Sequence, residues 1–153
     1  MTKSTKICLW SSPRNISTAM MYSFAQRPDT TVYDEPLYAH YLKVTGYEHP
    51  ARQQILQAQC QDGEQVVRDL ILNEPTAKKP ITFFKQMTHH LVDLNEDFLQ
   101  QTKNIIFIRD PQQIITSYAE VLPNVTIQIL GLKSSGLYLT SLLLEQPMKT
   151  VCL

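Results

Sequence analysis

A run of four apolar residues near the start of the chain, Ile7-Cys8-Leu9-Trp10, ends in a polar turn, Ser11–Asn15. An amphipathic segment, Ile16–Gln26, follows directly and opens on the hydroxyls of Ser17 and Thr18. Consecutive apolar residues suit a strand that is buried on both faces, and such strands belong to parallel sheets covered by helices. The start of the chain therefore predicts a strand, a polar loop and a helix.

The same alternation continues along the chain. Short apolar segments predict strands at 6–10, 31–33, 81–85 and 104–108. Helical spacing predicts helices at 37–44, 52–61, 64–72 and 93–101, and another from the N-cap Asp110 and Pro111 to about Val121. Strands that alternate with helices predict a three-layer α/β fold, in which a mostly parallel central sheet is flanked by helices.

The length of 153 residues suits a single domain, 1–153. The tail 129–153 differs from the rest, because Glu145 is its only acidic residue and Leu137–Leu144 is an apolar run. That run is too short to span a bilayer. We expect a buried helix or strand there, or the end of a C-terminally incomplete domain. If the run is exposed, we expect a partner or a homo-oligomer.

Charge and cysteine content exclude several classes of protein. The 14 basic residues are balanced by 14 acidic ones, so we expect no nucleic-acid partner. The first apolar run is too short for a signal peptide or a membrane span. Cys8, Cys60 and Cys152 lie far apart, which predicts no metal site and favours reduced thiols in the cytoplasm.

The first loop has the composition of a phosphate site. A helix start offers unpaired N–H groups and partial positive charge, Arg14 adds a cation, and Ser17 and Thr18 add donors. The patterns GxxxxGK[ST] and GxGxxG are absent, and all four glycines lie elsewhere. The loop must therefore bind without glycine. An ordinary strand–helix connection with a capping serine is the alternative.

A second candidate anion contact follows the strand predicted at 104–108. Arg109 stands where this strand ends, at the edge of the sheet where ligands of open α/β folds bind. Ser117 lies eight residues later, about two helical turns on. Both groups can then face one anion. A structural pair of Arg109 with Asp110 and an exposed serine are the alternative.

Together the segments SSPRNIST and FIRDPxxxxxSY resemble those of the sulfotransferase superfamily, whose fold is of the P-loop nucleotide hydrolase type. The resemblance covers about the first 130 residues and is closest to the bacterial-type branch, to which DEP and FFKQMTHH are also similar. It implies that Arg14, Asn15, Ile16, Ser17 and Thr18 hold the 5′-phosphosulfate of 3′-phosphoadenosine 5′-phosphosulfate. It also implies that Arg109 and Ser117 hold the 3′-phosphate.

The resemblance implies transfer of a sulfuryl group to a hydroxyl or amine of a small-molecule or glycan acceptor. A base must take the acceptor proton, and the candidates are His89, His90 and Glu35. In the family a histidine after the corresponding strand often has this role. Lys85 is expected to touch the phosphosulfate or the acceptor. The alternatives are solvated or helix-starting histidines. Glu35 is alternatively a turn residue before Pro36, or holds the acceptor through a hydrogen bond.

Two departures from the family pattern leave other functions open. Arg14 stands where many members have lysine, and arginine is a poor proton donor. The tail after Gln128 does not resemble the segment that covers adenine in the family. A non-catalytic or remnant nucleotide-binding domain is therefore the alternative. A nucleoside-triphosphate phosphotransferase is disfavoured by the missing GxxxxGK[ST] pattern.

Overall fold

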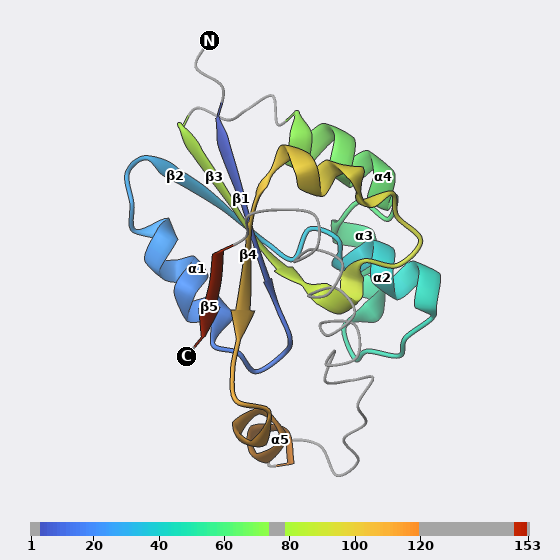
Figure 1. The fold of residues 1–153 in the computed structure, drawn as a ribbon. Helices are drawn as coiled ribbons and strands as arrows, with labels where there is room; N and C mark the ends of the chain where they lie inside the picture. The colour runs from blue at the N-terminus through green and yellow to red at the C-terminus, as the bar shows by residue number, and fades with distance from the viewer. Residues whose placement is uncertain (1–3, 74–78, 120–148, 153) are drawn as a thin grey trace.

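The computed structural model of the chain describes residues 4–73, 79–119 and 149–152. Its centre is a five-stranded sheet in the order β2-β3-β1-β4-β5, and every neighbouring pair is parallel. Helices cover both faces of this sheet (Figure 1). The strands are β1 (Thr5–Ser11), β2 (Thr30–Asp34), β3 (Ile81–Met87), β4 (Lys103–Ile108) and β5 (Lys149–Cys152). The predicted α/β fold with a parallel sheet is confirmed.

The four predicted strands are all present, each one to two residues longer than predicted at one or both ends. Strand β5 was not predicted. It pairs with β4 at the edge of the sheet, where Ile105 is opposite Lys149. Apart from this strand, the atypical tail 129–153 lies outside the described residues, and so does its apolar run Leu137–Leu144.

One face of the sheet is covered by helix α1 (Ser17–Ala25). Met21 and Phe24 of this helix pack against Leu9, Phe83 and neighbouring sheet residues. The rings of Phe24 and Phe83 are stacked, with centroids 4.1 Å apart. This contact fixes α1 against β1 and β3, so the loop between β1 and α1 is held at the carboxyl end of the sheet.

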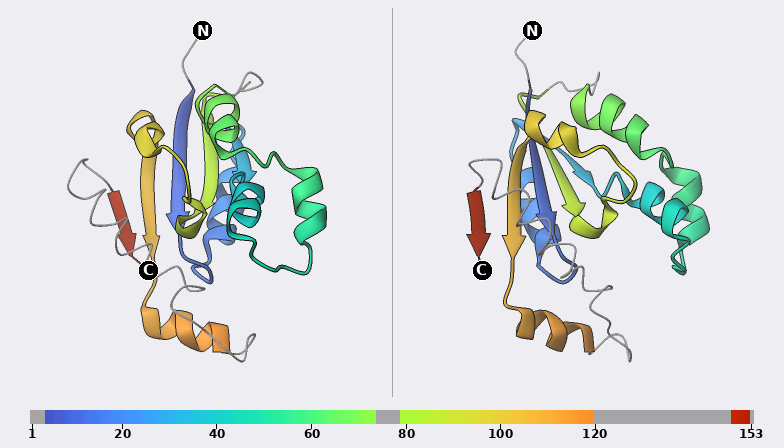
Figure 2. Two further views of the ribbon diagram at one scale, coloured as in Figure 1. Left: turned by 90° about the vertical axis from the view of Figure 1, so that its right-hand side faces the viewer. Right: turned by 45° about the vertical axis from the view of Figure 1, so that its right-hand side comes forward.

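Most of the helices between β2 and β4 lie on the opposite side of the sheet, where α3 packs against α2 rather than against the sheet (Figure 2). The helices on this side are α2 (Tyr38–Thr45), α3 (Arg52–Ala58), α4 (Gly63–Gln65), the π-helix η1 (Val66–Leu72) and the 3₁₀-helix η3 (Glu96–Gln101). Trp10 and Phe84 are fully buried on this face with Val67 and Ile71 of η1. Because Leu9 is buried on one face and Trp10 on the other, the apolar run of β1 fills both cores.

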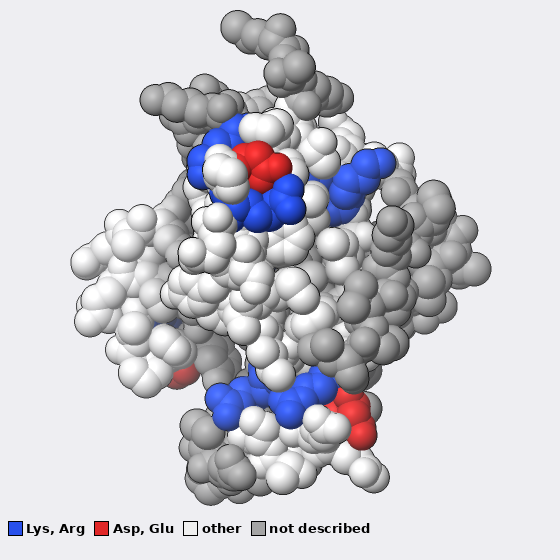
Figure 3. Space-filling view, turned by 90° about the vertical axis from the view of Figure 1, so that its left-hand side faces the viewer, with Lys and Arg blue, Asp and Glu red and all other residues white. Residues whose placement is uncertain are grey.

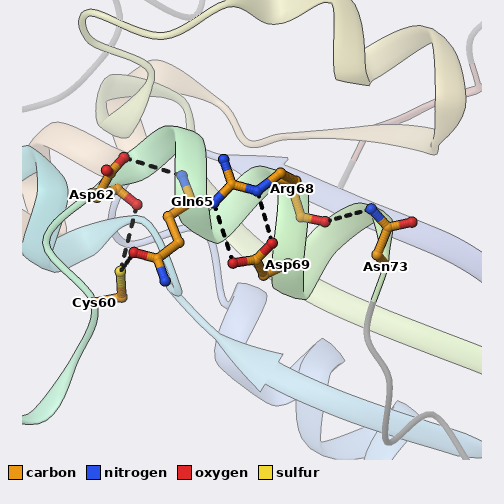
Figure 4. A network of polar contacts seen from close by, with 6 residues as sticks. All are labelled: Cys60, Asp62, Gln65, Arg68, Asp69 and Asn73. Carbon is orange, nitrogen blue, oxygen red and sulfur yellow. Dashed lines mark hydrogen bonds and ion pairs between the residues drawn. The ribbon is translucent and has the colours of Figure 1, made fainter.

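Two predicted helices differ in type. The predicted helix 64–72 begins as α4 and continues as the π-helix η1, and the predicted helix 93–101 is a 3₁₀-helix that begins at Glu96. Side chains form hydrogen bonds with backbone groups near both ends of the α4–η1 segment (Figure 4). Asp62 accepts a hydrogen bond from the backbone N–H of Gln65 at 3.1 Å, and Asn73 donates to the carbonyl of Arg68 at 2.9 Å.

The carboxyl ends of β1 to β4 lie at one edge of the sheet, because the strands are parallel. The 3₁₀-helix η2 (Thr88–His90) follows β3 there, and helix α5 (Pro111–Ala119) follows β4. Asp110 accepts a hydrogen bond from the backbone N–H of Gln112 at 2.8 Å, which confirms its predicted capping position. This edge brings together loops that are far apart in the sequence.

Candidate functional site

A cavity of about 500 Å³ opens at the carboxyl ends of the strands. Its walls come from the loop after β1, the turn after β2, the end of β3, the residue after β4 and helix α5. The lining residues are Pro13, Arg14, Asn15, Ile16, Ser17, Thr18, Glu35, Lys85, Met87, Arg109 and Ser117. All seven residues that the sequence suggested for the donor line this one cavity.

The loop after β1 is clamped to the sheet by Asn15, which is only 2% exposed. Its side-chain N–H donates to the carbonyl of Phe107 at 2.8 Å, so the loop is tied to the end of β4. The side-chain oxygen of Asn15 has no hydrogen-bond partner among the described residues. One N–H of the Asn15 side chain is therefore engaged with β4, and the backbone N–H groups of the loop face the start of α1, where an anion could bind.

Helix α1 points its N-terminus at the cavity. Its N-cap is Ile16, which makes no capping hydrogen bond through its side chain, and its first turn contains no acidic residue. The hydroxyl of Ser17 does not cap the helix but accepts a hydrogen bond from Ser11 at 3.0 Å. The first N–H groups of a helix have no intrahelical partner and carry partial positive charge. This end of α1 therefore suits an anion.

Arg14 and Arg109 join the first loop to α5. The guanidinium of Arg14 donates from Nε to Ser117 Oγ at 3.0 Å and from Nη2 to the carbonyl of Ser117 at 3.3 Å. Arg109 donates from Nη1 to the carbonyl of Arg14 at 2.9 Å and from Nε to Gln113 Oε1 at 3.2 Å. Two of the three nitrogens of each guanidinium are thus engaged within the protein.

Lys85 is the third cation of the cavity and is only 3% exposed. Its ammonium donates to Asp34 Oδ1 at 3.0 Å and forms an ion pair with Glu35. Burial lowers the pKa of Lys85, but the charge of Glu35 and the hydrogen bonds to both carboxylates outweigh it, so the pKa lies above its ordinary value. Lys85 is therefore a fixed positive charge within the cavity wall.

His89 and His90 are not among the lining residues of the cavity, although they follow Met87 closely. His90 is 1% exposed and stacks on Tyr38 of α2 at 4.9 Å, and both histidines contact the ring of Tyr41. Burial lowers the pKa of His89 to about 4. Burial, and then the charges of His89 and Lys85, hold the pKa of His90 well below its usual value. Both side chains are therefore neutral near pH 7.

Three residues of this site were not singled out from the sequence. Met87 and Pro13 line the cavity, and Asp34 holds Lys85. Strand periodicity could have found Met87, because residues two apart on a strand share a face. Asp34 ends β2 just before Glu35, and its position beside Lys85 follows from the register of β2 and β3.

The described residues contain no group of three or more His, Cys, Asp or Glu side chains that could hold a metal ion. No helix in the described ranges combines the length and the apolar character that a membrane span requires. The described lining of the cavity contains cations, hydroxyls and the N-terminus of α1.

Comparison with known proteins agrees with this chemistry. Residues 5–139 match the sulfotransferase domain family. The chain is 42% identical over 115 residues to branched-chain-amino-acid aminotransferase-like protein 1 of Arabidopsis thaliana, which covers 74% of this chain and 20% of that protein. It is 41% identical over 116 residues to protein 2 of the same name and plant, covering 75% and 20%.

The chain thus spans about 20% of the length of these curated relatives. No solved structure matches it. The family match nevertheless includes β1 to β4, both arginine motifs and every residue that lines the cavity. The chain therefore belongs to the sulfotransferase domain family.

Proposed function

We propose that this domain binds 3′-phosphoadenosine 5′-phosphosulfate and transfers its sulfuryl group to a hydroxyl or amine of a small-molecule or glycan acceptor. The observation that carries this proposal is the single cavity that gathers Arg14, Arg109, Lys85 and the N-terminus of α1. The bound nucleotide would supply the activated sulfuryl group. The protein would bind the anion and position the acceptor.

The charges of the cavity fit a ligand with several negative groups. Arg14, Arg109 and Lys85 line it, whereas Glu35 is the one acidic residue among the described residues that line it and is paired with Lys85. The loop Arg14–Thr18 would hold the 5′-phosphosulfate, and the 3′-phosphate would lie on the side of Arg109. Cations and N–H groups that are already oriented stabilise developing negative charge without reorganisation.

Among the candidate bases, Glu35 is best placed for proton removal because it lines the cavity and the histidines do not. Its backbone N–H donates to the carbonyl of Lys85 at 2.9 Å, which holds the turn against β3. We therefore propose that Glu35 is the base that takes the proton of the acceptor. Lys85, which stays protonated, would stabilise charge on the leaving oxygen rather than supply a proton.

Thermal denaturation with 3′-phosphoadenosine 5′-phosphate tests the binding step, since a ligand of the native state stabilises it by about 2.7 kcal/mol at a hundredfold excess over Kd. We expect that adding the nucleotide raises the melting temperature of the wild type and leaves that of the Arg109→Ala variant unchanged. Arg27→Ala is the control, because Arg27 is exposed, pairs with Asp29 and does not line the cavity. No shift of the wild type at millimolar ligand would rule out the proposal.

The role of Glu35 as the base is tested by measuring turnover with an acceptor that the protein sulfates. Glu35→Gln should lower kcat by about a hundredfold or more while keeping the thermal shift, because a general base contributes on this order. His89→Gln should keep most of the activity. The reverse pattern would give the role of base to the histidine.

A further inference from the structure

Two carboxylates that are consecutive in the chain contact the ammonium of Lys85. In the parallel register of β2 and β3, Asp34 is directly opposite Lys85, and its Oδ1 accepts from the ammonium at 3.0 Å. Successive residues of a strand point to opposite faces, but Glu35 follows β2 in a left-handed conformation with a φ of 46°. This turn lets the Glu35 carboxylate reach the same ammonium and form a second ion pair.

The two carboxylates lie in different surroundings. The side chain of Asp34 is 51% exposed and does not line the cavity, whereas that of Glu35 is 19% exposed and does. Lys85 is buried between them and the sheet. A buried ammonium needs a countercharge, because an unpaired charge out of water is strongly destabilising. One carboxylate meets this need, so the three groups together carry one negative charge in excess.

This excess charge bears on how Glu35 can act as the base. A carboxylate paired with an ammonium accepts a proton less readily, so the Glu35 side chain must turn from Lys85 toward the acceptor. If Glu35 were the sole partner of Lys85, this movement would leave a buried charge unpaired. The contact of Asp34 with Lys85 does not involve Glu35 and would persist. The backbone N–H of Glu35 donates to the carbonyl of Lys85 at 2.9 Å, so only the side chain has to move.

We infer that Asp34 is a positioning residue, which keeps Lys85 charged and in place in the cavity wall while Glu35 leaves the ammonium to take the acceptor proton. The inference rests on the proposed function. Once Glu35 has taken the proton it is neutral, and Lys85 and Asp34 remain as a balanced ion pair. The alternative is that Asp34 and Glu35 each contribute to folding independently, with no exchange of partners at Lys85.

The exchange of partners is tested without any ligand by a double-mutant cycle of thermal stability. Asp34→Asn and Glu35→Gln each leave Lys85 one carboxylate, so each should lower the melting temperature by less than about 4 °C. The double variant removes both countercharges and should lower it by about 10 °C or more. Adding Lys85→Met to the double variant should recover most of this loss, because the buried charge is then gone. Additive losses, or no recovery with methionine, would overturn the inference.

Asp29→Asn is the matched control for this cycle. Asp29 directly precedes β2, and its side chain pairs with that of Arg27, which is exposed. Its effect on the melting temperature should simply add to that of Glu35→Gln, because the two sites share no partner. A double variant of Asp34 and Glu35 that fails to fold, while both single variants fold, gives the expected non-additivity in its strongest form.

Turnover of 3′-phosphoadenosine 5′-phosphosulfate with an acceptor that the protein sulfates tests the role in the reaction. Asp34→Asn should lower kcat about tenfold and leave the KM for the nucleotide within about twofold of the wild-type value. In the Glu35→Gln background the same change should lower kcat by less than about twofold, because no exchange of partners remains. An unchanged kcat, or equal losses in both backgrounds, would overturn the inference. A wild type that does not bind the nucleotide would instead contradict the proposed function, whatever the stability cycle shows.

Discussion

Three residues with positive φ angles line the cavity although none is a glycine. They are Arg14, Ile16 and Glu35, with φ angles of 65°, 59° and 46°. Strained backbone of this kind persists only where surrounding contacts hold it, and it gathers at functional sites. The hydrogen bond from Asn15 to Phe107 of β4 and the ion pair of Glu35 with Lys85 of β3 supply that restraint here.

Ile16 is the clearest case, because its side chain is branched at Cβ and 54% exposed. A left-handed conformation costs a residue with a Cβ roughly 1–2 kcal/mol, whereas glycine adopts it freely and loses about 0.5–1 kcal/mol of entropy. We therefore expect Ile16→Gly to raise the free energy of unfolding by up to about 1 kcal/mol. Urea denaturation followed by circular dichroism measures this change.

Val44→Gly is the matched control for that measurement. Val44 is also branched at Cβ and 45% exposed, but it lies within α2 at helical angles. Glycine there should lower the stability by several tenths of a kcal/mol. If both glycine variants lose stability to the same extent, the strain at Ile16 does not contribute to stability.

At the scale of elements, helix α4 packs closely against α2 through Gly63. A Cβ atom on Gly63 would lie 2.5 Å from Leu94 Cδ2 and 2.8 Å from two atoms of the His40 ring. The ring cannot move easily, because Nδ1 accepts from the Gly63 N–H at 3.1 Å and Nε2 donates to the carbonyl of Val92 at 2.8 Å. Gly63 is therefore required by close approach.

Gly63→Ala should lower the free energy of unfolding by roughly 2–3 kcal/mol, since it overpacks a fixed contact. Gly46→Ala is a useful comparison, because Gly46 has a φ of 66° and no atom within 4 Å of the added Cβ. It should lose only about 1 kcal/mol, from backbone strain alone. Equal losses in chemical denaturation would contradict the packing argument.

The elements that sequence patterns predicted are those whose signal is local. The runs Ile7–Trp10 and Ile105–Ile108 predicted β1 and β4, because both faces of these strands are covered. The π-helix Val66–Leu72 could not be distinguished from an α-helix, since its apolar residues recur with almost the same period. Strand β5 has a weak local pattern and depends on pairing with the edge of β4.

Some residues of the candidate site could be placed from the sequence, and others could not. Arg109 and Lys85 were predicted from their positions at strand ends and Arg14 from the loop that follows the first strand, and the parallel sheet brings all three to one cavity. The positions of His89 and His90 depend on how η2 packs against α2, which the sequence does not encode locally. Their roles as bases stay a prediction.

For the whole molecule, the excess of positive charge is local rather than global. The chain has equal numbers of basic and acidic residues, 14 of each. On the face shown in Figure 3, lysine and arginine gather at two ends with uncharged residues between them. Helix α1 itself contains no charged residue. Binding of the proposed nucleotide would therefore depend on short-range contacts in the cavity, not on the net charge of the protein.

The partly buried His89 and the buried His90 contribute to the acid stability of the whole molecule. His89 has its pKa lowered to about 4, and that of His90 is also lowered, so the unfolded chain binds more protons than the native protein below pH 6.5. Stability should therefore fall as the pH falls from 6.5 towards 4, by up to about 1.4 kcal/mol per pH unit for each histidine. Urea denaturation at pH 7, 6 and 5 measures this slope.

His89→Gln should reduce the slope by the share of one proton while leaving the trend above pH 7 unchanged, because His89 is neutral in both states there. Identical slopes for the wild type and His89→Gln would show that His89 is accessible to protons in the native protein.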